Sequence, residues 1–89
     1  MFSKDVVLSN KTSLHARSAS RFVQIANNYK SEIYIKKGNT KIDAKSIIGV
    51  LTLGASRGSK ITIIADGKDE EEAVRALSDL IESNNLGER

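Results

Sequence analysis

The chain has 89 residues, and its 14 Lys and Arg against 11 Asp and Glu give a formal net charge of +3. This length supports a single domain over residues 1–89, and it is too short for a deep substrate pocket with walls of its own. The absence of cysteine and the presence of one histidine exclude disulfide scaffolds, thiol catalysis and multi-histidine metal sites. We expect no metal and no cofactor, and the charge is too small to demand a nucleic-acid partner.

The apolar segments are also too short for a membrane protein. The longest run of apolar residues and glycine, Ile47 to Leu51, falls far below a membrane span. The first residues lack the apolar segment of a signal peptide. We therefore expect a soluble, cytoplasmic protein with no membrane insertion.

The first third of the chain predicts a strand followed by a helix. Phe2 to Leu8 includes three consecutive apolar residues and is typical of a strand. After a polar loop, apolar residues recur at helical spacing on one face of a segment from Ala16 to Tyr29. Asn27 and Asn28 mark the end of this helix.

The middle of the chain predicts a hairpin and a short helix. Ile33 to Ile35 and Thr40 to Asp43 flank the turn pair Gly38-Asn39. Ser46 and Gly54 then bracket an apolar segment, Ile47 to Leu53, as the N-cap and C-cap of a short helix would.

The last third predicts a strand and the longest helix. Apolar residues alternate from Ile61 to Asp66. Asp69 precedes Glu72 by three residues, as in a capping box, and opens an acidic run that suits a helix N-terminus. The order β-α-β-β-α-β-α predicts an α+β fold in which an antiparallel sheet carries its helices on one face.

His15 is the first candidate for chemistry, because it stands just before the first predicted helix. Helix starts present unpaired N–H groups and favour a bound anion, and Arg17 adds a permanent cation that can grip phosphate. An imidazole in this position can act as a nucleophile and hold a phosphoryl group on nitrogen. The alternative is a histidine that only caps the helix or lies on the surface.

Ser46 is the second candidate, with two interpretations. It is either a plain N-cap or a phosphorylation site, where a phosphate at a helix start would be tolerated electrostatically.

Two other patterns give weaker indications of a functional site. The segment from Gly54 to Lys60 lacks the spacing and the following helix of a phosphate loop. The lysines beside the hairpin turn lack interleaved aromatic residues, so we interpret them as a solvated edge.

Two motifs resemble the HPr family, the phosphocarrier proteins of the bacterial phosphoenolpyruvate-dependent sugar phosphotransferase system. They are Ser13-Leu14-His15-Ala16-Arg17 and Ala44-Lys45-Ser46-Ile47-Ile48-Gly49, and the likeness covers nearly the whole chain. The resemblance implies an open-faced sandwich, with a four-stranded antiparallel sheet and three helices on one side.

The resemblance also implies a stoichiometric carrier rather than an enzyme. The histidine matching His15 accepts a phosphoryl group on Nδ1 from phosphorylated Enzyme I and passes it to IIA domains of sugar permeases. The arginine matching Arg17 helps to hold the phosphate. Ser46 matches the regulatory serine of Gram-positive-type members, which HPr kinase/phosphorylase phosphorylates and which then acts with catabolite control protein A.

Two positions depart from the family pattern, since Ser13 and Ser18 stand where Gly and Pro are usual. A second hypothesis therefore stays open: an HPr-like regulatory paralogue that acts through Ser46 and partner binding rather than sugar phosphotransfer. For a carrier, we expect a monomer with a shallow, partly apolar docking surface. Its predicted residues come from the first helix and the short helix: Ser20, Gln24, Ile47, Ile48 and Leu51.

Overall fold

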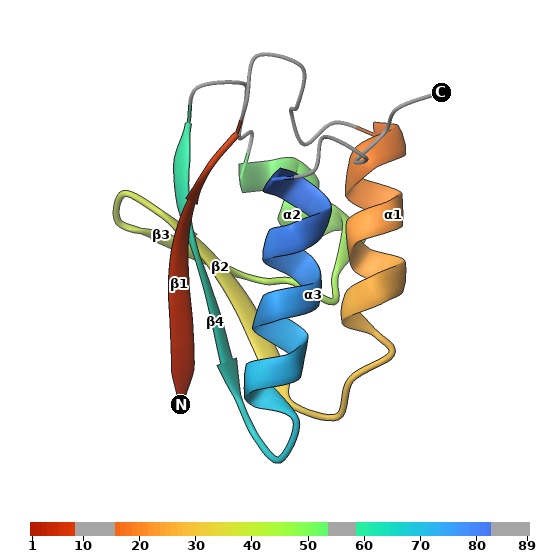
Figure 1. Ribbon diagram of the computed structural model, residues 1–89. Helices are drawn as coiled ribbons and strands as arrows, with labels where there is room; N and C mark the ends of the chain where they lie inside the picture. Colours follow the sequence, from red (N-terminus) through yellow and green to blue (C-terminus); the bar gives the residue numbers. More distant parts are fainter. Residues whose placement is uncertain (9–15, 54–58, 83–89) are drawn as a thin grey trace.

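The computed structural model describes residues 1–8, 16–53 and 59–82, and it has the predicted order of elements (Figure 1). Four strands and three helices occupy these ranges: β1 (Phe2–Val7), α1 (Ala16–Ala26), β2 (Glu32–Lys37), β3 (Thr40–Asp43), α2 (Ile47–Leu53), β4 (Lys60–Asp66) and α3 (Glu70–Glu82).

The strands form one antiparallel sheet in the order β1-β4-β2-β3. Val6 lies opposite Ile61 in the β1–β4 pair, and Ile35 lies opposite Ile63 in the β2–β4 pair. The three helices lie on the same side of this sheet (Figure 1). The predicted fold class, an α+β open-faced sandwich, is therefore confirmed.

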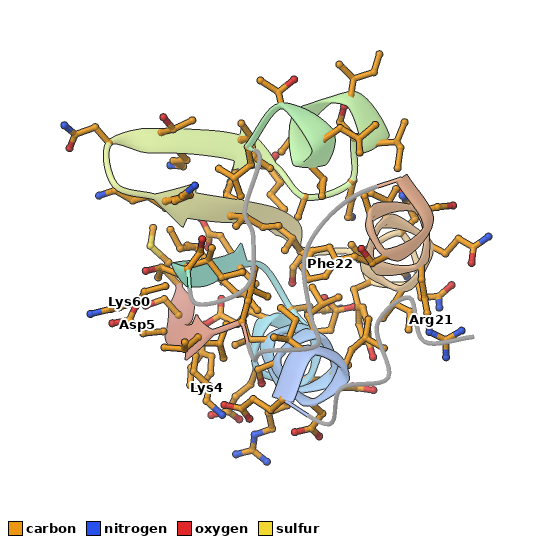
Figure 2. All side chains as sticks on the ribbon, turned by 90° about the horizontal axis from the view of Figure 1, so that it is seen from above. Lys4, Asp5, Arg21, Phe22 and Lys60 are labelled. Carbon is orange, nitrogen blue, oxygen red and sulfur yellow. The ribbon has the colours of Figure 1, made fainter. Side chains whose placement is uncertain are left out.

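The core lies between the sheet and the helices. Alternate residues of β2 and β4 are buried, as the period of two along a strand requires. Phe22 is fully buried and points from α1 toward the sheet (Figure 2). The other large, fully buried apolar side chains come from both layers: Leu8, Ile33, Ile35, Ile61, Ile63, Leu77 and Ile81.

The opposite face of the sheet carries no helix among the described residues. Lys60 and Asp5 point away from the helical layer on this side (Figure 2), and they form an ion pair at 3.8 Å. Lys4, the neighbour of Asp5 in β1, points to the other side and reaches Glu82 of α3 at 3.4 Å. We call this helix-free side of the sheet the open face.

α1 ends at Ala26, so Asn27 and Asn28 mark the end of the helix as predicted, and the helical spacing of apolar residues continues past this end to Tyr29. Asn28 and Tyr29 donate their N–H groups to carbonyls three residues back, so the helix closes in a tighter turn. Tyr29 still packs against the core. This packing explains why Tyr29 continues the helical spacing of the apolar residues of α1 although it lies beyond the helix.

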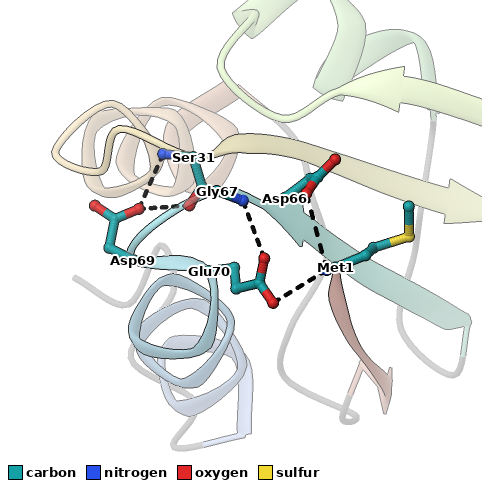
Figure 3. Close-up of polar contacts among 6 residues, drawn as sticks. All are labelled: Met1, Ser31, Asp66, Gly67, Asp69 and Glu70. Carbon is teal, nitrogen blue, oxygen red and sulfur yellow. Dashed lines mark hydrogen bonds and ion pairs between the residues drawn. The ribbon is translucent and has the colours of Figure 1, made fainter.

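The start of α3 is capped by residues other than the predicted pair Asp69 and Glu72. The Glu70 carboxylate accepts the N–H of Gly67 at 3.0 Å, which is half of a capping box. Asp69 instead binds the turn after α1 (Figure 3). Its carboxylate accepts Lys30 N–H at 2.8 Å, Ser31 N–H at 2.9 Å and the Ser31 hydroxyl at 2.5 Å.

This turn has electrostatic and steric consequences. The Ser31 hydroxyl and the Lys30 N–H lower the pKa of Asp69 to about 2. The Gly67 N–H and the N-terminal ammonium lower the pKa of Glu70. Gly67 has a φ of +156° and lies against Ser31, where an added Cβ would come within 2.7 Å of the Ser31 Cα. Glycine is therefore required at position 67, where the segment before α3 lies against Ser31.

Candidate functional site

The first candidate site belongs, in sequence, to the start of α1. α1 begins at Ala16, directly after His15. His15 and the side chain of Arg17 lie outside the part of the chain that the structure describes, so their predicted roles remain predictions. The first turn of α1 contains no acidic residue, whereas α3 has three there. The positive end of the α1 dipole is therefore not offset by carboxylates of its own first turn.

The buried face of α1 holds this helix start in place. Ala19, Phe22 and Ala26 are fully buried at spacings of three and four. Ser18, which stands where the family usually has proline, is only 1% exposed. No buried side-chain nitrogen or oxygen in the described ranges lacks a hydrogen-bond partner. Serine at position 18 is thus accommodated without an unsatisfied polar group.

Ser46 is the N-cap of α2, as the sequence predicts. Its hydroxyl accepts the Gly49 N–H at 3.1 Å, and its carbonyl accepts the Val50 N–H at 3.0 Å. The first turn of α2 also contains no acidic residue. Both candidate phosphorylation positions therefore stand at helix starts without first-turn carboxylates.

The loop before Ser46 is tied to the end of α1, a connection that sequence patterns do not reveal. Lys45 Nζ donates to the Tyr29 carbonyl at 2.6 Å. The Asn27 side-chain amide donates to the Val23 carbonyl at 2.9 Å and to the Lys45 carbonyl at 3.3 Å. These bonds fix the position of Ser46 relative to α1.

The predicted docking residues of α1 lead toward this connection. Ser20 and Gln24 are exposed, and Asn27 follows them at helical spacing on the same face. Because Asn27 binds the Lys45 carbonyl, the exposed stripe of α1 runs to the start of α2.

The predicted docking residues of α2 form an apolar surface. Ile48 is 73% exposed, Leu51 41% and Ile47 37%, while Val50 and Leu53 anchor the helix in the core. Large exposed apolar side chains clustered on one short helix are typical of protein–protein contacts. We call Ile47, Ile48 and Leu51 the α2 patch.

Metal binding and membrane spanning find no support in the described ranges. There, no three His, Asp or Glu side chains come close enough to hold a metal ion. None of the helices of the described residues is long and apolar enough to cross a bilayer.

Comparisons with known proteins agree with the fold and the motifs. A family model described as "PTS HPr component phosphorylation site" matches residues 2–83. The phosphocarrier protein HPr of Neisseria meningitidis serogroup A is 42% identical over 81 residues, which cover 91% of both chains. The HPr-like protein Crh of Halalkalibacterium halodurans is 49% identical over 82 residues, covering 92% of this chain and 98% of Crh.

Solved structures give the same result. HPr-C-His of Thermoanaerobacter tengcongensis has a TM-score of 0.92 to this chain at 48% identity, covering 100% of this chain and 99% of that one. HPr of Bacillus anthracis has a TM-score of 0.86 at 42% identity, covering 90% of this chain and 95% of the other. With the family model spanning almost all of its residues, this chain belongs to the HPr family of phosphocarrier proteins.

Proposed function

We propose that this protein is a phosphoryl carrier of the sugar phosphotransferase system. It accepts a phosphoryl group from phosphorylated Enzyme I on His15 and passes it to IIA domains of sugar permeases. One observation carries the proposal: His15 stands immediately before α1, whose first turn holds Arg17 and no carboxylate, in a chain of this family.

The chemistry follows from the helix start. The lone pair of His15 Nδ1 attacks phosphorus, so a nitrogen–phosphorus bond forms while the bond from phosphorus to the donor breaks. The positive end of α1 and the Arg17 guanidinium stabilise the charge on the three phosphoryl oxygens. A carrier must also release the phosphoryl group, and a helix end with one arginine binds phosphate more weakly than a closed pocket does.

Donor and acceptor proteins must both reach His15, and the α2 patch with Ser20 and Gln24 supplies a surface for them. These residues come from two packed helices of one chain, so a monomer suffices for the transfer. The protein is consumed and regenerated stoichiometrically, and it acts as a substrate of Enzyme I rather than as an enzyme.

Regulation acts at Ser46 in this proposal. HPr kinase/phosphorylase transfers a phosphoryl group from ATP to the Ser46 hydroxyl, and the product binds with catabolite control protein A. A phosphate at this N-cap meets the positive end of α2 and adds about two negative charges beside the α2 patch. The modification therefore changes partner choice without opposing the helix.

A second candidate is a regulatory paralogue that uses Ser46 alone. The observation in its favour is that Crh proteins are as similar to this chain as HPr proteins are: B. subtilis Crh is 42% identical over 78 residues. The presence of His15 and Arg17 keeps the carrier first, because a purely regulatory protein needs neither residue.

The deciding experiment is phosphotransfer from phosphoenolpyruvate through Enzyme I, followed by intact-protein mass. The expected result is the gain of one acid-labile phosphoryl group that His15→Ala abolishes and Ser46→Ala retains. No gain with Enzyme I from several sources would refute the carrier. The same chain would then be tested with ATP and HPr kinase/phosphorylase, with Ser46→Ala as the control.

The docking surface has its own test. Ile48→Glu places a charge in the α2 patch and is expected to raise the KM of Enzyme I for this carrier at least about tenfold, as loss of a central apolar contact does. Val7→Glu, which changes another exposed apolar residue on β1, is the matched control and should leave KM unchanged. Equal effects of the two variants would contradict the assigned surface.

A further inference from the structure

The open face of the sheet has an ordered arrangement of side chains, set by strand register. One row across the strands contains Asp5, Thr62, Lys36 and Lys41. The next row contains Ser3, Ile64, Tyr34 and Asp43. Val7 and Lys60 lie beyond the first row, and Asp66 and Glu32 lie beyond the second. These twelve residues define the open face.

Charge on the open face is separated along the strands. Lys36, Lys41 and Lys60 form a basic end, where Asp5 is the one carboxylate of the open face. The acidic end consists of three carboxylates around one hydroxyl: Glu32, Asp43 and Asp66 around Tyr34. The Tyr34 hydroxyl donates to Glu32 at 2.9 Å, and the pKa of Tyr34 is raised by Glu32, with smaller contributions from Asp43 and Asp66.

This arrangement of charges destabilises the sheet of a single chain. Lys36 lies directly opposite Lys41, and Glu32 lies directly opposite Asp66. Like charges directly opposite one another destabilise a pair of strands. Among the described residues, Lys36, Lys41 and Glu32 form no ion pair, and Asp66 has only the N-terminal ammonium at 3.8 Å. Lys41 lies over the Tyr34 ring, 4.5 Å from its centroid.

The centre of the open face is less polar. Tyr34, Ile64 and Thr62 are half-buried between the two charged ends. An aromatic ring and a branched aliphatic side chain at the centre, with charges around them, is the usual layout of a protein–protein contact.

We propose that the open face binds a second copy of this chain, face to face, through a two-fold axis that runs across the strands. This axis reverses the strand direction and places the basic end of each copy on the acidic end of the other. Lys41 then faces Asp43 of the second copy, and Lys60 faces Asp66 of the second copy; each contact occurs twice. A two-fold axis along the strands would keep the acidic end of each copy on the acidic end of the other, with Asp66 facing Glu32, and would leave Lys41 only Asp5 as an opposite charge. The axis across the strands pairs more opposite charges and no like charges, so the charge pattern favours it.

The expected dimer is weak and depends on salt. Four strands about 4.8 Å apart and four rows about 7 Å apart give a face on the order of 400 Å² per copy. Two such faces bury less than the roughly 1,000 Å² of a stable interface. We expect a dissociation constant on the order of 0.1–1 mM at low salt. The helices lie on the opposite side, so the α2 patch stays accessible and the proposal is independent of the proposed function.

Analytical ultracentrifugation of the full chain at about 1 mM protein, in low salt and in about 0.5 M salt, tests this association. The expected weight-average mass rises above 9.7 kDa with concentration at low salt and returns to that value at high salt. A mass that stays at the monomer value at about 1 mM in low salt would overturn the proposal.

Charge-reversed variants test the orientation. The acidic variant Lys41→Glu/Lys60→Glu and the basic variant Asp43→Lys/Asp66→Lys should each stay monomeric, and their equimolar mixture should form a heterodimer. Lys30→Glu/Lys68→Glu reverses two exposed lysines outside the sheet and is the matched control, expected to associate like the wild type. Circular dichroism checks that each variant is folded. If the mixture stays monomeric, or if the control also loses association, the proposed surface is wrong.

Discussion

The N-cap hydrogen bond of Ser46 lets the effect of a phosphorylation-blocking substitution be worked out. Ser46→Ala removes the acceptor of the Gly49 N–H, which now lies at 3.1 Å, from a helix of only 7 residues. Loss of an N-cap serine costs about 1 kcal/mol of unfolding free energy. For a chain of this size, that corresponds to a fall in Tm of roughly 4–8 °C. Thermal unfolding followed by circular dichroism measures the difference.

Ser46→Asn is the matched control for this prediction. Asparagine keeps a side-chain oxygen acceptor and ranks with serine as an N-cap, but it offers no hydroxyl for phosphorylation. We expect its Tm to lie within about 2 °C of the wild type. If the Ala and Asn variants unfold at the same temperature, the hydroxyl does not stabilise α2 and the reasoning fails. If the prediction holds, Ser46→Asn is the better variant for blocking regulation.

Three further predictions concern the fold that supports the site. Gly67→Ala should lower the unfolding free energy by more than about 2 kcal/mol in urea denaturation, because its Cβ would meet the Ser31 hydroxyl at 2.6 Å; a neutral effect would refute this close approach. The carboxylate of Asp69 has its pKa lowered to about 2 from 3.8, so its stabilisation is complete above about pH 4 and is lost as pH falls toward 2. Asp69→Asn should remove this loss of unfolding free energy between about pH 4 and pH 2. If the unfolding free energy of the variant fell with pH as steeply as that of the wild type, the prediction would be wrong. Phe22→Ala removes a fully buried ring and should cost about 3–5 kcal/mol, measured by the same urea titration.

The elements were predictable because their signals are local. Gly38, with a φ of +59°, makes the hairpin turn that the Gly38-Asn39 pair predicts. Ser46 caps α2 through a bond to a residue three positions away. The alternation of apolar residues in β4 appears directly as its buried face.

What the sequence could not supply are contacts between distant positions. The capping-box pattern predicts the wrong partner for Asp69, because its partner in the structure, Ser31, lies 38 residues earlier and no local pattern marks it. The same is true of Lys45 and Tyr29, which connect α2 to α1. The charge separation on the open face also emerges only once strand register is known.

The candidate site also contains residues of two kinds: those whose role rests on the sequence motif, and those whose exposure the structure shows. The roles of His15 and Arg17 rest on the motif and on family membership, because His15 and the side chain of Arg17 lie outside the part of the chain that the structure describes. The exposure of Ile48 and Leu51 follows from the geometry of a short helix whose Val50 and Leu53 are buried. A residue pattern predicts which faces of a helix are exposed, but not which partner covers them.

The place of β1 in the sheet has a consequence for biosynthesis. β1 leaves the ribosome before the other three strands of the sheet, yet within the sheet it pairs only with β4, which ends at Asp66. The β2–β3 hairpin can form as soon as its residues emerge, while β1 must wait for a distant segment. An incomplete nascent chain therefore exposes an unpaired strand that other chains could capture. We infer that the sheet closes only after β4 has emerged, so that the yield of folded protein depends on keeping β1 free until then.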